Sequence, residues 1–207
     1  MINNDDTYKT IVALSEGTYS EKRSKFIALA VPVTTVDDVK KYLTECQKKY
    51  FDARHLCYAY KLGVDGLVFR ANDNGEPSGT AGKPILGQIN SLNLTDVLVV
   101  VVRYFGGIKL GTSGLIVAYR TAASEALANA QIIEKTVDET ISFRFEYLFL
   151  NEVMKVVKEL SPETLFQEFD MDCIMKLRIR KSLMPVLKNR LEKIETLHLI
   201  PDVYKKC

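Results

Sequence analysis

Apolar positions along the first 133 residues alternate between the two-residue period of strands and the longer period of helices. The unbroken apolar run from Val97 to Val102 predicts a central strand that is covered on both faces. Shorter apolar runs bounded by turn residues predict four further strands, over residues 10–14, 25–33, 55–61 and 67–71. An α/β sandwich is therefore expected in this half of the chain.

Three amphipathic helices are predicted between these strands. Thr35 can cap the first with Asp38 in a capping box, and Pro84 fits the first turn of the second. Thr112 or Ser113 can cap the third. The apolar stripes are Val36, Val39, Leu43, Cys46 and Tyr50 in the first helix, Ile85, Leu86, Ile89 and Leu92 in the second, and Leu115, Tyr119, Ala122 and Ala126 in the third.

The pattern changes in the last third of the chain. The predicted order is strand 140–149, helix 152–160, strands 164–169 and 173–181, helix 183–194 and strand 196–200. This βαββαβ order is that of a ferredoxin-like domain. We therefore predict an α+β protein with domains at residues 1–133 and 140–207, joined by the charged linker 134–139.

Composition limits the classes of function. The 207 residues hold 28 Lys+Arg against 26 Asp+Glu, so a net charge of +2 gives no general attraction for nucleic acid, and a polyanion site must be local. The N-terminus lacks a basic stretch followed by an apolar one, and no apolar run is long enough to cross a bilayer. A cytoplasmic protein without membrane contact is expected.

The cysteines do not form a recognisable chemical motif. Cys46, Cys57, Cys173 and Cys207 include no C-x-x-C pair, which argues against a zinc site, a redox pair or a disulfide framework. All but Cys207 are interpreted as small core residues. No metal or cofactor is expected.

The polar loop 72–82 is the first candidate anion site. Walker A chemistry is excluded because Pro77 and Pro84 stand where that motif needs glycine and Ser or Thr. Backbone N–H groups at Gly79 and Gly82, next to the Lys83 ammonium and a helix start, could still hold a phosphate or a carboxylate. The alternative is a flexible turn with a solvated lysine.

A second loop repeats this arrangement. Arg103 and Lys109 bracket a glycine pair and lead into another helix start, with glycines at Gly106, Gly107 and Gly111. Two such helix starts in one domain favour a ligand over coincidence. For Arg103 alone, an ion pair with Asp73 or Glu76 is an equal alternative.

Arg54 and His55 precede a strand, and His55 is the candidate catalytic residue. Without a nucleophile partner, a hydrogen-bonded structural histidine is the favoured interpretation. His55 and Cys57 could offer two metal ligands on one strand face, but no second pair completes a site.

In the last domain, alternation places basic side chains on one face of the sheet, at Arg144, Lys176, Arg178 and Arg180. The stacking aromatics of RNA-binding sheets are not found on this face, so a solvated surface is favoured.

Four segments together resemble the Impact/YigZ family: Ser24–Phe26, Ala53–Tyr60, Asp73–Leu86 and Val101–Gly111. With the second domain of the bacterial members, the resemblance covers nearly the whole chain. Asn74 and Ser113 depart from the residues expected there.

The resemblance implies an N-terminal domain similar to domain IV of elongation factor G and a ferredoxin-like domain similar to its domain V. It also implies a link to translation, because eukaryotic members are translation regulators. Their accessory domain is missing from this sequence, so their regulatory partner is not carried over.

The resulting hypothesis is a non-catalytic RNA- or ribosome-binding protein with a further protein partner in translation. The loop glycines, together with Arg54, Lys83, Arg103 and Lys109, would bind the backbone phosphates of the RNA. One alternative is a small enzyme acting on an anionic substrate at the face formed by His55, Lys83 and Arg103. Another is a module that binds an acidic protein.

Overall fold

The computed structural model describes residues 6–201, which divide into two compact units. The N-terminal unit comprises residues 8–135, and the C-terminal unit joins residues 136–201 to Asp6 and Thr7. Both mix strands and helices, so the chain is a two-domain α+β protein. No helix within residues 6–201 combines the length and the apolar character that crossing a membrane requires.

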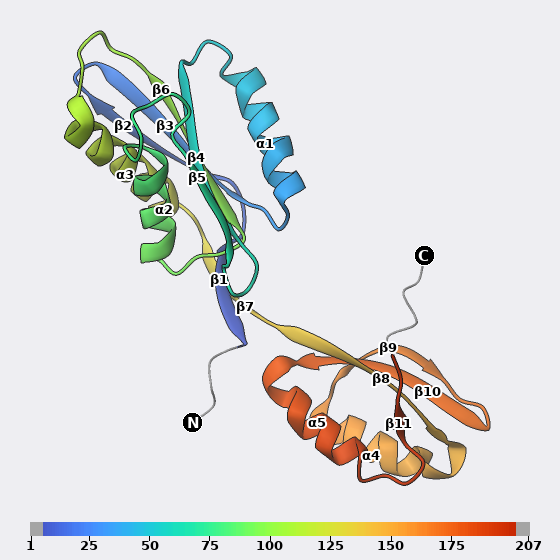
Figure 1. Ribbon diagram of the computed structural model, residues 1–207. Coiled ribbons are helices and arrows are strands. Elements are labelled where there is room, and N and C mark those ends of the chain that lie inside the picture. Colours follow the sequence, from blue (N-terminus) through green and yellow to red (C-terminus); the bar gives the residue numbers. More distant parts are fainter. Residues whose placement is uncertain (1–5, 202–207) are drawn as a thin grey trace. The chain divides into compact units, whose positions relative to one another are not determined.

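A five-stranded antiparallel sheet forms the centre of the N-terminal unit (Figure 1). Its order is β2 (Ser15–Glu21), β3 (Ser24–Pro32), β6 (Val97–Tyr104), β4 (His55–Leu62) and β5 (Val68–Asn72). Strand β6 is central and buried from Val97 to Arg103, which confirms the prediction from its unbroken apolar run. Each face of the sheet has its own hydrophobic core.

Helices cover both faces of this sheet (Figure 1). Helix α1 (Val36–Lys49) packs on one face and has the predicted capping box between Thr35 and Asp38. Helices α2 (Gly82–Ser91) and α3 (Gly111–Ala128) cover the other, where small side chains let α3 approach the sheet closely.

Several predicted boundaries in this unit were wrong. The first strand, β1 (Thr7–Ile11), begins before residue 10, and β2 was missed because its buried face holds the small residues Ser15 and Gly17. Leu92, expected to face inward, is exposed just beyond the end of α2. Neither Thr112 nor Ser113 caps α3, which begins earlier, at Gly111.

The predicted linker 134–139 is largely strand. Strand β7 (Ile132–Thr136) pairs with β1, and β8 begins at Asp138. Its charged residues favoured a solvated linker, but pairing with a segment more than a hundred positions away overrides that local signal.

The C-terminal unit has the predicted split order. Its strands β8 (Asp138–Glu146), β9 (Glu163–Glu168), β10 (Asp172–Arg180) and β11 (His198–Leu199) align as β11-β8-β10-β9. The 3₁₀ turns η1 (Tyr147–Phe149) and η2 (Lys181–Leu183) lead into helices α4 (Leu150–Leu160) and α5 (Met184–Leu191). The helices and one sheet face share a core that includes Phe143, Met175 and Leu187.

The side-chain carboxylate of Asp6 binds the end of β10. Arg180 donates to Asp6 through Nε at 2.6 Å and Nη2 at 2.8 Å, and the Ser182 amide donates to the same carboxylate. These hydrogen bonds, led by that of Arg180, hold the pKa of Asp6 well below its usual range.

The predicted basic face of this sheet is partly neutralised. Arg180 pairs with Asp6, and Arg178 pairs with Glu163 at 3.1 Å. Contrary to the prediction, an aromatic ring does lie on the face, because Phe166 stands opposite Lys176 in the register of β9 and β10. Arg144 is exposed on β8, on the same face.

Candidate functional site

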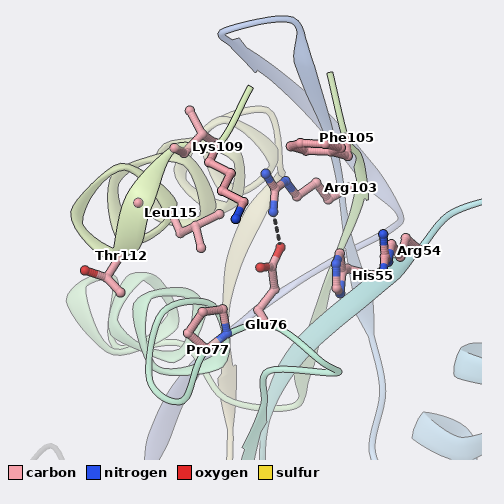
Figure 2. Close-up of a pocket in the computed structure, with 11 residues that line it drawn as sticks. Arg54, His55, Glu76, Pro77, Arg103, Phe105, Lys109, Thr112 and Leu115 are labelled. Carbon is pink, nitrogen blue, oxygen red and sulfur yellow. Dashed lines mark hydrogen bonds and ion pairs between the residues drawn. The ribbon is translucent and has the colours of Figure 1, made fainter. Parts of the chain in front are cut away.

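A cavity of about 430 Å³ opens at the ends of β4 and β6 in the N-terminal unit. Figure 2 shows side chains from four separate segments around it. Its lining residues are Arg54, His55, Glu76, Pro77, Arg103, Phe105, Lys109, Leu110, Gly111, Thr112 and Leu115. Three cations and one carboxylate therefore surround a concave space of the size of a small ligand.

A buried ion pair forms one wall. Arg103 Nη1 donates to Glu76 Oε1 at 2.6 Å, and the two side chains are only 7% and 4% exposed. The Tyr119 hydroxyl donates to the same oxygen at 2.9 Å. The Arg103 guanidinium lies 5.5 Å from the ring centres of Phe26 and Phe105, while its Nε has no partner among the described residues. Glu76, rather than Asp73, is thus the carboxylate that fixes Arg103.

His55 is held by the backbone. Its Nδ1 lies 3.0 Å from the Asn74 carbonyl oxygen, which requires that Nδ1 carry the proton and donate. No group of three or more metal-ligating side chains occurs within residues 6–201. The hydrogen bond to the Asn74 carbonyl is what the structural interpretation of His55 predicts. Neighbouring Arg54 is exposed on the same rim of the cavity.

Helix α3 begins at the cavity. Gly111 and Thr112 line it, and no side chain caps this helix N-terminus. Gly111 has a φ of +75°, a conformation that most side chains disfavour. Backbone N–H groups and the positive end of the helix dipole therefore lie beside the Lys109 ammonium, an arrangement suited to an anion.

The start of helix α2 is different, because the chain's own Asp73 occupies it. The Asp73 carboxylate accepts N–H groups from Gly79 at 2.8 Å, Ala81 at 2.9 Å and Gly82 at 2.8 Å. Desolvation opposes ionisation of this carboxyl, but these three hydrogen bonds and Lys83 outweigh it and lower its pKa. The backbone N–H groups of Gly79 and Gly82, predicted to hold a phosphate or a carboxylate, thus donate to a carboxylate of the chain itself.

Lys83 does not join the other candidate cations. It lines a separate, shallower hollow together with Arg120 on α3. The expected clamp of four cations is therefore divided, with Arg54, Arg103 and Lys109 at the cavity and Lys83 elsewhere. The remaining loop glycines are required by the fold of the loop. Gly106 passes so close to the Arg23 backbone that an added Cβ would lie 2.0 Å from its carbonyl carbon. Gly107 takes a φ of +87°, a conformation that other residues disfavour.

The cysteines of residues 6–201 are free and buried, as expected, whereas Cys207 lies outside the described residues. Cys57 adjoins the cavity network through hydrogen bonds to the Asp73 carbonyl and the Tyr119 hydroxyl. Burial raises its pKa to about 12, which favours the neutral thiol over the thiolate.

Some site residues were not identified from the sequence. Phe105 and Leu110 are apolar, and Thr112 was expected to cap a helix. Tyr119 was assigned to the core, where it lies, but its hydroxyl also binds Glu76. A tyrosine on an alanine-rich stripe was the one available signal, because a buried phenol needs a polar partner.

Comparison with known proteins confirms the family resemblance of the four sequence segments. The model of the Impact N-terminal domain matches residues 22–127. The IMPACT family member YvyE of Bacillus subtilis is 35% identical over 153 residues, covering 74% of this chain and 70% of that protein. An IMPACT family member of Haemophilus influenzae is 31% identical over 172 residues, covering 82% and 84%.

One solved structure, described as that of a hypothetical protein, superposes with a TM-score of 0.70 at 26% identity and covers 95% of this chain and 98% of its own. The likeness to domains IV and V of elongation factor G stays a prediction. The family model and the relatives agree on one assignment: this chain belongs to the Impact family.

Proposed function

We propose that this protein is a cytosolic, non-catalytic RNA-binding protein whose cavity receives a backbone phosphate of RNA, in the context of the ribosome. The link to translation rests on the family, whose eukaryotic members the sequence resemblance identifies as translation regulators. The proposal concerns the N-terminal unit, which contains the matched family domain.

The observation that carries the proposal is the contrast between the two helix starts. Asp73 fills the start of α2, whereas the start of α3 has no side-chain cap and lines a cavity with Arg54 and Lys109. The local excess of positive charge favours a phosphate there, although the chain as a whole is nearly neutral. The protein would therefore recognise the sugar-phosphate backbone and the shape of the RNA, because the α3 start, Arg54 and Lys109 are suited to phosphates rather than to base edges.

Arg103 has a different role in this proposal. Its charge is already balanced by Glu76, and its side chain is buried between two rings. It therefore shapes the wall of the cavity, while Arg54 and Lys109 supply the charge for a polyanion. The enzyme alternative needed His55, Lys83 and Arg103 in one site, but Lys83 lies at the other hollow and Arg103 is ion-paired.

Two charge-matched double variants test the proposal by co-sedimentation with ribosomes at several salt concentrations. Arg54→Gln/Lys109→Gln is expected to weaken binding about tenfold or more at low salt and to reduce the salt slope by about 1.4 to 1.8, since each phosphate contact contributes about 0.7 to 0.9. Lys83→Gln/Arg120→Gln removes the same charge from the same unit and is expected to bind almost as the natural protein does.

Equal losses in the two variants would mean that net charge, rather than the cavity, attracts the ribosome. Failure of the natural protein to pellet at low salt would remove the ribosome from the proposal. Repeating the titration with isolated ribosomal RNA separates RNA contact from contact with ribosomal proteins. Pelleting that survives nuclease treatment would favour the protein-interaction alternative.

A further inference from the structure

One end of the C-terminal sheet exposes a group of large apolar side chains. Tyr147 is 58% exposed, Leu148 80%, Phe169 42% and Met171 86%. They come from η1 and from the turn between β9 and β10, and we call them the apolar tip. Figure 1 shows this turn beside the end of β8, at the start of α4.

The apolar tip is held in place by the backbone. The Tyr147 amide donates to the Met171 carbonyl at 3.2 Å, which joins the two segments. Cys173 Sγ donates to the Asp170 carbonyl, and Phe149, the last residue of η1, packs into the core of the unit. The exposed side chains therefore project from a fixed frame, and several neighbouring apolar groups on a folded surface mark an interaction site.

Acidic residues surround this tip. Residues 145–149 and 167–175 contain Glu146, Glu168, Asp170 and Asp172 but no lysine or arginine. The next cations along β8 and β10, Arg144 and Lys176, lie on the same sheet face but further from the tip than the pair of Asp172 and Glu146. None of the four carboxylates forms an ion pair within the described part of the chain. Residues 192–196 also adjoin the tip, because the Glu146 amide donates to the Thr196 hydroxyl. The single lysine of this segment, Lys193, stands between Glu192 and Glu195 in the sequence.

Two of these carboxylates oppose each other directly. Asp172 and Glu146 are cross-strand partners in the register of β10 and β8. Like charges in directly opposite positions destabilise a sheet, so this pair costs the isolated protein stability. A cationic partner would remove the repulsion on binding, whereas a nucleic acid would increase it.

We infer that the apolar tip binds a basic segment of another protein, in which lysines or arginines contact the carboxylates and one or two apolar side chains cover Leu148 and Met171. The exposed apolar groups supply the anchor and the unpaired carboxylates supply the selectivity. This surface does not depend on the proposed RNA site, because its charge is opposite. A second copy of the chain is disfavoured as the occupant, since two acidic tips repel each other.

The test uses the full chain, labelled with ¹⁵N, and three short fluorescent peptides of matched length. The first peptide is composed of lysine and leucine, the second of glutamate and leucine, and the third of lysine and serine. Only the first combines both features and is expected to shift the amide signals of residues 146–148 and 168–172. Leu148→Ser/Met171→Ser should weaken its binding about tenfold, as loss of two interface anchors does. Leu183→Ser/Val186→Ser, exposed elsewhere on the same unit, is the matched control.

Glu168→Gln/Asp172→Asn should lower the affinity and flatten its salt dependence. The inference is overturned if the lysine-leucine peptide shifts no signals at the tip, if the control variant weakens binding equally, or if the glutamate-leucine peptide binds as well. It is also overturned if an RNA oligonucleotide, zwitterionic vesicles or self-association produces the same shifts in place of the peptide.

Discussion

Replacing Glu76 by alanine is expected to destabilise the N-terminal unit by about 3–5 kcal/mol, the usual loss when one partner of a buried ion pair is removed. Arg103 would keep its charge in a side chain that is only 7% exposed, between the rings of Phe26 and Phe105. The Tyr119 hydroxyl would lose its carboxylate acceptor as well. Urea unfolding, followed through the amide signals of β6 so that this unit is monitored separately, measures the change.

The double variant Glu76→Leu/Arg103→Met is the control for this prediction. Because it removes both charges and fills much of their volume, it should recover most of the stability lost in Glu76→Ala. A loss below about 1 kcal/mol in the single variant would show that water reaches Arg103, which contradicts its burial. If the double variant is no more stable than the single one, packing rather than charge explains the loss.

The same ion pair also links stability to the proposed function. Glu76→Gln keeps an oxygen for Tyr119 and Arg103 but removes the negative charge from the cavity wall. In this variant Arg103 becomes an unbalanced cation beside Arg54 and Lys109. A less stable protein that binds ribosomes more tightly is the expected combination, as stability is exchanged for function at charged sites.

The fold was predicted well where a local pattern coincides with burial. The apolar run of β6, the capping box of α1 and the βαββαβ order of the last third are visible in the sequence because each reflects a short-range rule. Strand β7 was missed because its partner β1 lies at the other end of the unit. Long-range pairing leaves no signal in the charged residues Glu134 and Lys135 themselves.

The candidate site was predicted only in part, for a related reason. Glycines and cations near a helix start indicate that an anion binds there, but they do not identify that anion. At α2 it is Asp73, six to nine positions earlier in the same loop, and at α3 the cavity remains open to a ligand. The grouping of Lys83 with Lys109 likewise depends on where a side chain of α2 and a side chain of the loop before α3 point, which the sequence pattern does not give.

Asp73→Ala is the second variant with a large expected effect. It leaves the backbone N–H groups of Gly79, Ala81 and Gly82 without their acceptor, and we expect a loss of about 2–4 kcal/mol in the same unfolding measurement. Asp37→Ala is the matched control, because Asp37 is an exposed carboxylate in a surface pair with Lys40 and should cost less than about 0.5 kcal/mol.

The pH dependence of these variants has a defined sign. The folded-state pKa of Asp73 is lowered, so its contribution is complete above the ordinary value of 3.8 and is lost as the pH falls through the folded-state value. The natural protein should therefore lose more stability than Asp73→Ala on acidification below about pH 4. Equal losses would mean that the carboxylate is as readily protonated in the folded chain as in the unfolded one.

Asp73→Ala also tests whether the start of α2 is an anion site that the chain fills by itself. Sulfate could replace the missing carboxylate, since three converging N–H groups, the helix dipole and Lys83 remain. Added sulfate should then stabilise Asp73→Ala more than Asp37→Ala, which corrects for the general stabilisation that sulfate gives folded proteins. Equal stabilisation would show that the α2 loop needs its carboxylate to form, in which case only the start of α3 is available to an external phosphate.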